Sequence, residues 1–193
     1  MNNEKKKEIL AKTGAFLEGH FQLSSGLHSK YYFQCALIMQ FPDITEMICK
    51  DLSQHLLQHL SVIKIDKVLS PALGGIIVGY EMSRALKCKS IFAEREEGKM
   101  TLRRGFQITK GENILIAEDV TTTGGSVLEL EQIVRKHSGN VVGFVAFVDR
   151  SGGKFKPVEK FVSWFQMEIE NYQPTSCPLC KDGITLIKPG SRK

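Results

Sequence analysis

The stretch Asn113–Ser126, NILIAEDVTTTGGS, decides the fold. Its first five residues form a short apolar run, which is typical of a strand buried in a parallel sheet. Two acids follow, and a turn rich in threonine and glycine then leads into a segment with Val127, Leu130 and Val134 at helical spacing. This order of strand, turn and helix indicates one unit of an α/β protein.

The same alternation continues on both sides of this stretch. The apolar patterns predict helices at 4–13, from 43 and at 76–86, and strands at 67–70, 90–93 and 141–148. Asp43, followed three residues later by Glu46, predicts a capping box at the start of the second helix. We therefore expect a parallel sheet with flanking helices.

Polar and glycine-rich segments follow the predicted strands. In a parallel sheet the carboxyl ends of the strands meet at one edge, where ligands bind. The segments expected at that edge are Ser70–Gly75, Glu94–Arg95, Glu118–Ser126 and Asp149–Arg150. Their convergence predicts a binding site.

Composition sets broad limits on the class of protein. A chain of 193 residues, 42% of them hydrophobic and 24% charged, suits one soluble globular domain. The net charge of +5 fits anionic small molecules and nucleic acid alike. The Lys/Glu-rich start is unlike a signal peptide, and the longest apolar run, Val141–Val148, is too short to span a membrane. With an odd number of cysteines, five, these features predict a cytoplasmic protein with free thiols.

The threonine and glycine turn has the chemistry of a phosphate cradle. Glycines allow close approach, exposed N–H groups and the helix dipole favour an anion, and the hydroxyls add donors. Neither GxxxxGK[ST] nor GxGxxG is present. Because carboxylates repel phosphate, Glu118 and Asp119 suit ribose hydroxyls or a Mg²⁺ held partly by substrate oxygens. The plainer alternative is an ordinary strand–turn–helix with a helix cap.

The segment EDVTTTGGS resembles the phosphoribosyl pyrophosphate signature of the type I phosphoribosyltransferases, with Glu118 in place of the commoner aspartate. The resemblance implies that Glu118 and Asp119 bind the ribose hydroxyls and that the turn holds the 5-phosphate. The implied phosphoribosyl pyrophosphate site comprises Leu73, Gly74, Glu118, Asp119, Val120, Thr121, Thr122, Thr123, Gly124, Gly125 and Ser126.

A second segment, HFQLSSGLHSKYYF, is similar to the N-terminal motif of orotate phosphoribosyltransferases. The matching residues are Phe21, Leu23, Ser25, Gly26, Ser29, Tyr31 and Phe33. By this resemblance Tyr32 and Phe33 flank the base, with core packing as the plainer role for these aromatic residues. An arginine after a late strand and a threonine of the phosphate turn contact orotate in this family, which implies Arg150 and Thr122. A planar guanidinium suits the orotate carboxylate.

The resemblance, which covers about residues 14–153, also implies the fold and the reaction. We expect a single domain over 1–193, with a core at about 41–154 and a small hood from about 1–40 and 155–193. The implied activity transfers 5-phosphoribosyl from phosphoribosyl pyrophosphate to orotate in pyrimidine (UMP) biosynthesis. Mg²⁺ is the implied cofactor, bound through substrate oxygens with no direct protein ligand assigned.

The charged segment 94–112 is expected to be a mobile loop or hairpin. In the family this loop closes over the partner subunit's site, which implies a homodimer. Arg95 and Lys99, with Asp119, are the implied catalytic residues, and the backbone of 72–75 is expected to support pyrophosphate. Arg103 and Arg104 are weaker candidates, and a solvated hairpin is the alternative. Two lysines usual in the family are absent, since Ser24 and Gly74 occupy those places.

Cys177 and Cys180 have the spacing of a metal knuckle. A structural zinc needs four ligands, and neither a second CxxC nor a trusted histidine spacing supplies the rest. We therefore expect a C-terminal turn with free thiols, and a zinc site is the alternative.

Two other functions share parts of this pattern. A purine phosphoribosyltransferase would have the phosphate signature without the N-terminal motif. A regulator on the same fold would bind nucleic acid through a dense basic surface, but the basic clusters stop at Lys5–Lys7 and Arg103–Arg104. We therefore expect neither nucleic acid nor membrane as a partner.

Overall fold

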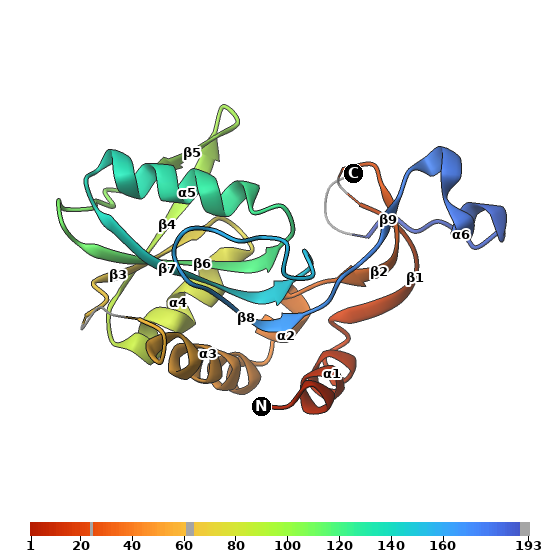
Figure 1. The fold of residues 1–193 in the computed structure, drawn as a ribbon, viewed down its shortest axis with the longest axis horizontal. Coiled ribbons are helices and arrows are strands. Elements are labelled where there is room, and N and C mark those ends of the chain that lie inside the picture. Colours follow the sequence, from red (N-terminus) through yellow and green to blue (C-terminus); the bar gives the residue numbers. More distant parts are fainter. Residues whose placement is uncertain (24, 61–63, 190–193) are drawn as a thin grey trace.

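A six-stranded sheet forms the centre of the computed structural model, which describes residues 1–23, 25–60 and 64–189 (Figure 1). The strand order is β5-β4-β3-β6-β7-β8. In that order the strands are Lys99–Leu102, Lys89–Glu96, Lys67–Pro71, Asn113–Thr121, Asn140–Asp149 and Phe161–Gln166. Among the described strands of this sheet, only β5 runs antiparallel to its neighbour. The predicted α/β fold is confirmed.

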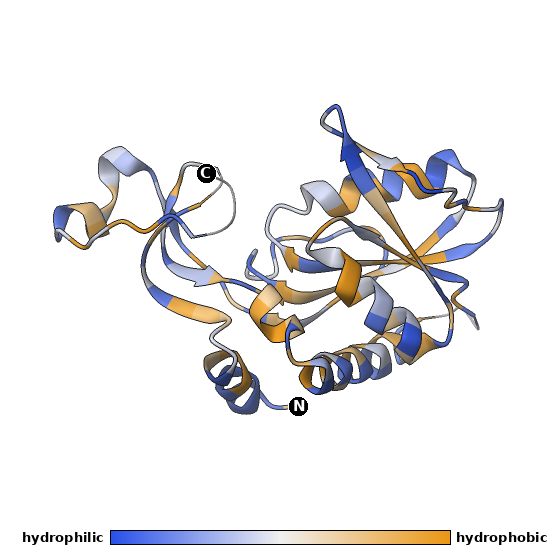
Figure 2. Ribbon diagram, turned by 180° about the vertical axis from the view of Figure 1, so that it is seen from behind, coloured by the Kyte–Doolittle hydropathy of each residue, from blue (hydrophilic) through white to orange (hydrophobic). Residues whose placement is uncertain are grey.

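Helices cover both faces of the sheet. α3 (Pro42–Leu57) and α4 (Gly75–Leu86) pack on one face, and α5 (Gly125–Lys136) packs on the other (Figure 1). α3 buries Ile48, Leu52 and Leu56 at a spacing of four, and α5 buries Val127, Leu130 and Val134. Each such side chain contributes roughly 1.5–3 kcal/mol by burial. Figure 2 shows the hydrophobic residues along the central strands and the inner sides of the helices.

A second, small sheet lies at one end of the molecule (Figure 1). Its order is β1-β2-β9, with β1 at Phe16–Gln22, β2 at His28–Phe33 and β9 at Asn171–Tyr172. The short elements around it are α1 (Asn3–Lys12), α2 (Ala36–Met39), η1 (Pro174–Ser176) and α6 (Pro178–Lys181). We call β1, β2, β9, η1 and α6 the hood. Both ends of the chain contribute to it.

Three predicted boundaries are wrong. α3 begins at Pro42, and Asp43 lies inside its first turn without capping it, because proline at the first position starts the helix one residue earlier. β6 continues past Ala117 to Thr121, since Glu118, Val120 and Thr121 pair with β7. β8 falls within the residues predicted for the hood, but it pairs in parallel with β7 in the central sheet.

The segment 94–112 was predicted to be a mobile loop or a hairpin, and residues 94–102 of it form a hairpin. β4 and β5 pair antiparallel around Glu97 and Gly98, which have φ angles of 48° and 82°. Two positive φ angles characterise the type I′ turn that suits a two-residue hairpin. The tip projects from the sheet and is hydrophilic (Figure 2). No described helix is both long and apolar enough to cross a membrane.

Candidate active site

The carboxyl ends of β3, β6 and β7 lie side by side, as the sequence predicted. Thr121 at the end of β6 is paired in register with Asp149 at the end of β7, and the N–H of Arg150 donates to the Thr121 carbonyl over 2.8 Å. The turn after β3 also meets β6, because the Asp119 carboxylate lies against Gly74. The turn after β3, the two acids and the segment with Arg150 therefore share one edge of the sheet.

The two acids occupy different environments. Glu118 is 7% exposed, and burial together with the nearby Asp119 charge raises its pKa well above the ordinary value. Its Oε1 accepts a hydrogen bond from the Asp119 N–H at 3.0 Å, and Asp119 Oδ1 accepts one from the Val120 N–H at 2.8 Å. These bonds fix the two carboxyl groups at the strand end, and no cationic side chain among the described residues forms an ion pair with either.

The phosphate turn depends on Gly124. This residue has a φ angle of 79° and precedes α5, whose first turn has no side-chain cap. A Cβ at Gly124 would lie 2.1 Å from the ring of Phe155, whereas one at Gly125 would meet no atom closer than 3.8 Å. The uncapped N–H groups and the helix dipole make this turn suitable for an anion.

The turn after β3 differs in one detail from the prediction. The Ala72 N–H donates to the Ala93 carbonyl over 2.8 Å, so it joins β3 to β4 and is not free for a ligand. Leu73, in contrast, is 85% exposed at the crest of this turn. The predicted support of pyrophosphate by the backbone is therefore restricted to residues 73–75.

Asp149 organises the loop that carries Arg150, a role that the sequence analysis missed. Its carboxylate accepts from the N–H groups of Ser151 at 2.8 Å and Gly153 at 3.2 Å. An aspartate followed by serine and glycines is the usual sequence of such a turn, so the signal was present in DRSGG. Burial lowers the pKa of the Arg150 guanidinium, and the nearby Tyr32 and Cys35 oppose this effect.

A cavity of about 480 Å³ joins the phosphate turn to the Arg150 loop. Thr122, Thr123 and Arg150 line it together with Ser151, Phe155 and Ile169. Among the described residues, Arg150 Nε is one of the few buried side-chain atoms that have no hydrogen-bond partner. The structure thus brings together the two residues, Thr122 and Arg150, that were predicted to contact the base.

The three aromatic residues of the N-terminal motif separate into different roles. Phe33 is 5% exposed and packs on Phe16 and Phe165, with ring centroids 4.8 and 5.9 Å away. β2 therefore turns this ring into the core, and the contact of Phe33 with the base stays a prediction. Tyr31 stacks on Phe16, and Tyr32 is the half-buried ring near Arg150. Ser24 lies outside the described residues.

Known proteins resemble this chain over its full length. The sequence profile for the phosphoribosyl transferase domain matches residues 42–179. The orotate phosphoribosyltransferase of Caldicellulosiruptor bescii is 50% identical over 193 residues, which is 100% of both chains. That of Carboxydothermus hydrogenoformans is 51% identical over 179 residues, or 93% of each chain.

The chain belongs to the orotate phosphoribosyltransferase family. Solved structures agree on the fold: the orotate phosphoribosyltransferase of Aeropyrum pernix has a TM-score of 0.65 at 22% identity, covering 83% of this chain and 92% of its own. An adenine phosphoribosyltransferase from Thermoanaerobacter pseudethanolicus has a TM-score of 0.60 at 12% identity, covering 71% and 88%. The fold alone does not select the base.

The cations of the β4–β5 hairpin are placed differently from one another in this structure. Arg95 forms a bidentate pair with Glu129 of α5 at 2.7 and 3.0 Å, and Arg104 forms one with Glu94 at 2.8 Å. Lys99 is exposed at the start of β5. The catalytic roles of Arg95 and Lys99 stay predictions, since the hairpin in this conformation packs against α5 of its own chain.

The family resemblance gave no role to the histidines, and their spacing along the sequence pointed to no ligand set. His20 and His28 lie beside Cys177 and Cys180 in the hood. Neither linear spacing nor helical periodicity reveals this cluster, because His20 and Cys177 are 157 residues apart in sequence. The pairing of β2 with β9 and the bridge between Phe21 and Ile187 bring the two parts of the chain together.

Proposed function

We propose that this chain transfers the 5-phosphoribosyl group of phosphoribosyl pyrophosphate to orotate, giving orotidine 5′-phosphate and pyrophosphate. The observation that carries the proposal is the shared cavity of Thr122 and Arg150, next to the Gly124 turn and the two acids. The names of relatives at about 50% identity support the choice of orotate. This reaction supplies the pyrimidine nucleotide in UMP biosynthesis.

Different residues of the site bind different parts of phosphoribosyl pyrophosphate. The N–H groups at the start of α5 and the hydroxyls of Thr122, Thr123 and Ser126 bind the 5-phosphate. Glu118 and Asp119 accept hydrogen bonds from the ribose hydroxyls, which are neutral donors that suit carboxylates. Residues 73–75 support the pyrophosphate from the adjoining strand end.

Arg150 and Thr122 orient the base. The Arg150 guanidinium can bind the orotate carboxylate bidentately, and in a half-buried cavity this pair is stronger than at the surface. The ring nitrogen of orotate then replaces pyrophosphate at the ribose carbon, with loss of its proton. Tyr32, near Arg150, covers the base on the hood side. The protein accelerates the step by positioning both reactants and by stabilising the leaving charge.

Mg²⁺ fits the acids present at this edge. Mg²⁺ is commonly held by one or two carboxylates and by substrate phosphates, and Asp119 is the half-buried acid that faces the pyrophosphate turn. When bound with substrate, the ion would neutralise charge on pyrophosphate. The protein's own part is to hold Asp119 in place through the Val120 N–H.

The β4–β5 hairpin supplies the cationic side chains of the proposed active site. Its exposed cations, Arg95 and Lys99, would neutralise the leaving pyrophosphate and exclude water after a movement of the hairpin. We propose that they do so in the partner subunit of a cytoplasmic homodimer, in keeping with the family.

A steady-state assay with phosphoribosyl pyrophosphate and Mg²⁺ tests the proposal. Orotate, uracil, adenine, guanine, hypoxanthine and xanthine are offered separately to the wild type, to Arg150→Ala and to the surface control Arg135→Ala. Arg135 pairs with Glu131 and Glu159 at the far end of α5. We expect turnover of orotate alone, an Arg150→Ala loss of about 100-fold or more in kcat/KM (about 2.7 kcal/mol) and a normal Arg135→Ala enzyme.

Turnover of a purine would support the phosphoribosyl pyrophosphate site and contradict the assignment of orotate as the base. Binding of phosphoribosyl pyrophosphate without turnover of any base would favour a regulator. Equal activity of the Arg150→Ala and Arg135→Ala enzymes would remove Arg150 from the site.

A further inference from the structure

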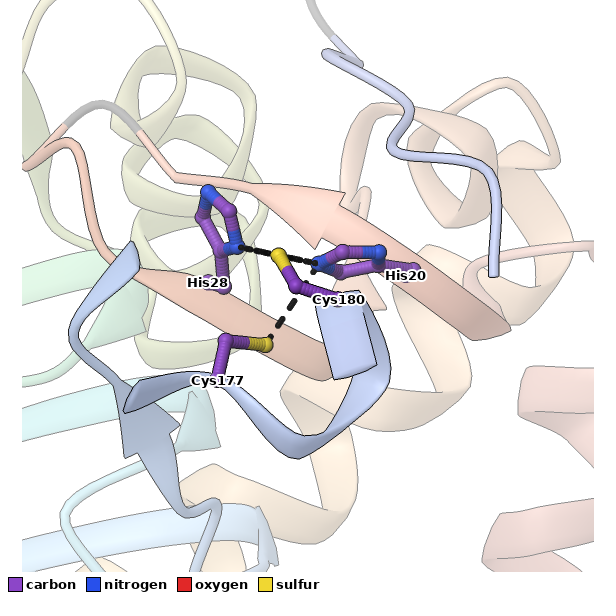
Figure 3. A group of neighbouring side chains, drawn as sticks. All are labelled: His20, His28, Cys177 and Cys180. Atoms are coloured by element: carbon purple, nitrogen blue, oxygen red, sulfur yellow. Dashed lines mark hydrogen bonds between the residues drawn. The ribbon is translucent and has the colours of Figure 1, made fainter. Parts of the chain in front are cut away.

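Four potential metal ligands from two distant parts of the chain meet in the hood (Figure 3). His20 comes from β1, and His28 begins β2. Cys177 is the N-cap residue of α6, and Cys180 lies within that helix. Their ligand atoms all lie within 4.8 Å of one another. We propose that these four residues bind one structural zinc ion.

The distances among the ligand atoms suit a tetrahedral site. His20 Nε2 lies 3.0 Å from His28 Nδ1, 3.6 Å from Cys177 Sγ and 3.8 Å from Cys180 Sγ. Cys180 Sγ lies 3.3 Å from His28 Nδ1. Zinc bonds of about 2.0–2.1 Å to nitrogen and about 2.3 Å to sulfur put neighbouring ligand atoms of a tetrahedron roughly 3.3–3.8 Å apart. Four of the six pairs of ligand atoms are thus within a few tenths of an ångström of this range, and the other two pairs lie within 4.8 Å.

The orientation of His20 also fits a ligand. Its Nδ1 lies 2.7 Å from the Ile184 carbonyl, to which a protonated Nδ1 donates. That bond leaves the lone pair on Nε2, which is the atom directed at the two sulfurs (Figure 3). Metal-bound histidines characteristically donate their other N–H to a carbonyl or carboxylate in this way.

Burial argues against a cluster without a metal. His20, His28 and Cys177 are 1%, 4% and 1% exposed, so water reaches little of the cluster. Two imidazoles and two thiols facing one centre can form only a few hydrogen bonds among themselves, and unpaired buried polar atoms are costly. Both cysteines are free thiols in this structure. A set of two nitrogens and two sulfurs in tetrahedral arrangement favours zinc.

The zinc would join two parts of the hood that are otherwise weakly connected. β9 has only two residues and α6 only four, and residue 187 adds a single isolated bridge to β1. Such short elements bury too little to stay folded alone. A zinc would therefore fasten the C-terminal segment to the β1–β2 hairpin, which carries Tyr32 toward the base site.

Metal analysis of the purified full-length chain tests the site. The protein is prepared without an affinity tag and dialysed, and bound metals are measured by mass spectrometry. We expect about one zinc per chain, as a four-ligand site requires. After replacement by Co²⁺, we expect the visible bands of a tetrahedral ion and a thiolate-to-cobalt charge-transfer band.

Two cysteine variants provide the matched comparison. Cys180→Ser removes the exposed ligand, whereas Cys88→Ser removes a half-buried thiol at the β4 end of the molecule, outside the cluster. We expect Cys180→Ser to lose the zinc and to unfold at a lower temperature, and Cys88→Ser to keep both. If Cys180→Ser is insoluble, the cobalt spectrum and chelator titration of the wild type still decide.

Three results would overturn the proposal. The first is a folded wild-type chain that takes up no zinc from a stoichiometric supply. The second is a Cys177–Cys180 disulfide, found by mass mapping, in protein purified under reducing conditions. The third is another metal bound in place of zinc.

Discussion

The Asp119 carboxylate occupies the space beside Gly74 that a side chain at position 74 would need. A Cβ built on Gly74 would lie 2.6 Å from Asp119 Oδ2 and 2.9 Å from its Cγ. The φ angle of Gly74 is −57°, so close approach and not backbone conformation requires glycine here. The lysine that many family members have at this place is incompatible with this position of Asp119.

Gly74→Ala is therefore expected to displace the Asp119 carboxylate. Asp119 is short and held by the Val120 N–H, so it cannot move aside without losing that hydrogen bond. We expect kcat/KM for phosphoribosyl pyrophosphate to fall about 10-fold or more, the equivalent of about 1.4 kcal/mol. The control is Ile77→Ala, an exposed position one turn further along α4. A Gly74→Ala enzyme with unchanged kinetics would show that Asp119 tolerates the added methyl group.

Gly124 and Gly125 are adjacent but should respond differently to alanine. Gly124→Ala forces a left-handed backbone, at about 1–2 kcal/mol, and places a methyl group against the Phe155 ring. Gly125→Ala would make only an ordinary contact, 3.8 Å from the Thr123 hydroxyl, and removes a flexible residue from the helix start. Thermal unfolding should show a fall in Tm of about 4 °C or more for the first, since 1 kcal/mol corresponds to about 2–4 °C in a chain of this size. The Tm of Gly125→Ala should match or exceed that of the wild type. If both variants lost the same Tm, the left-handed backbone at Gly124 would not explain the loss.

The sequence predicts those parts of the site whose residues are contiguous better than those that combine distant segments. The Asn113–Ser126 stretch identifies a buried strand, two acids and an anion-binding turn, because its apolar run, charges and glycines are contiguous. Arg150 could be placed beside them, since parallel strands end at one edge. Core packing of Phe33 remained only one of two alternatives, because alternation along β2 predicts two faces without saying which one meets the core.

Contacts between distant segments were the harder part. The histidine and cysteine cluster depends on β9, a strand of two residues with no sequence pattern of its own. The pairing of Arg95 with Glu129 likewise depends on the hairpin packing against α5, which local charge patterns do not specify.

The buried Glu118 should make stability depend on pH. Because its folded-state pKa is raised, the folded chain holds this proton more tightly than the unfolded chain does. The wild type is therefore stabilised while Glu118 is protonated, and loses that stability as pH rises from the ordinary glutamate pKa through the raised one. Each unit of the pKa difference corresponds to about 1.4 kcal/mol.

Glu118→Gln removes this dependence and keeps an oxygen to accept the Asp119 N–H. We expect the Tm of the variant to exceed that of the wild type at neutral pH by a few degrees, with the difference closing at acid pH. Differential scanning calorimetry across pH measures it. A difference that is constant with pH would assign the effect to packing, not to ionisation.

Arg95 offers a test that separates a structural role from a catalytic one. In this structure its guanidinium pairs with Glu129 at 42% exposure, so the pair contributes little to stability. If Arg95 leaves Glu129 to neutralise pyrophosphate, Arg95→Ala should lower kcat about 100-fold while Glu129→Gln leaves kcat near normal or higher, because it frees the hairpin. Single-turnover kinetics distinguishes this from slow product release. If the two variants instead lose kcat equally, the salt bridge itself is what the reaction needs, and Arg95 acts by holding the hairpin against α5.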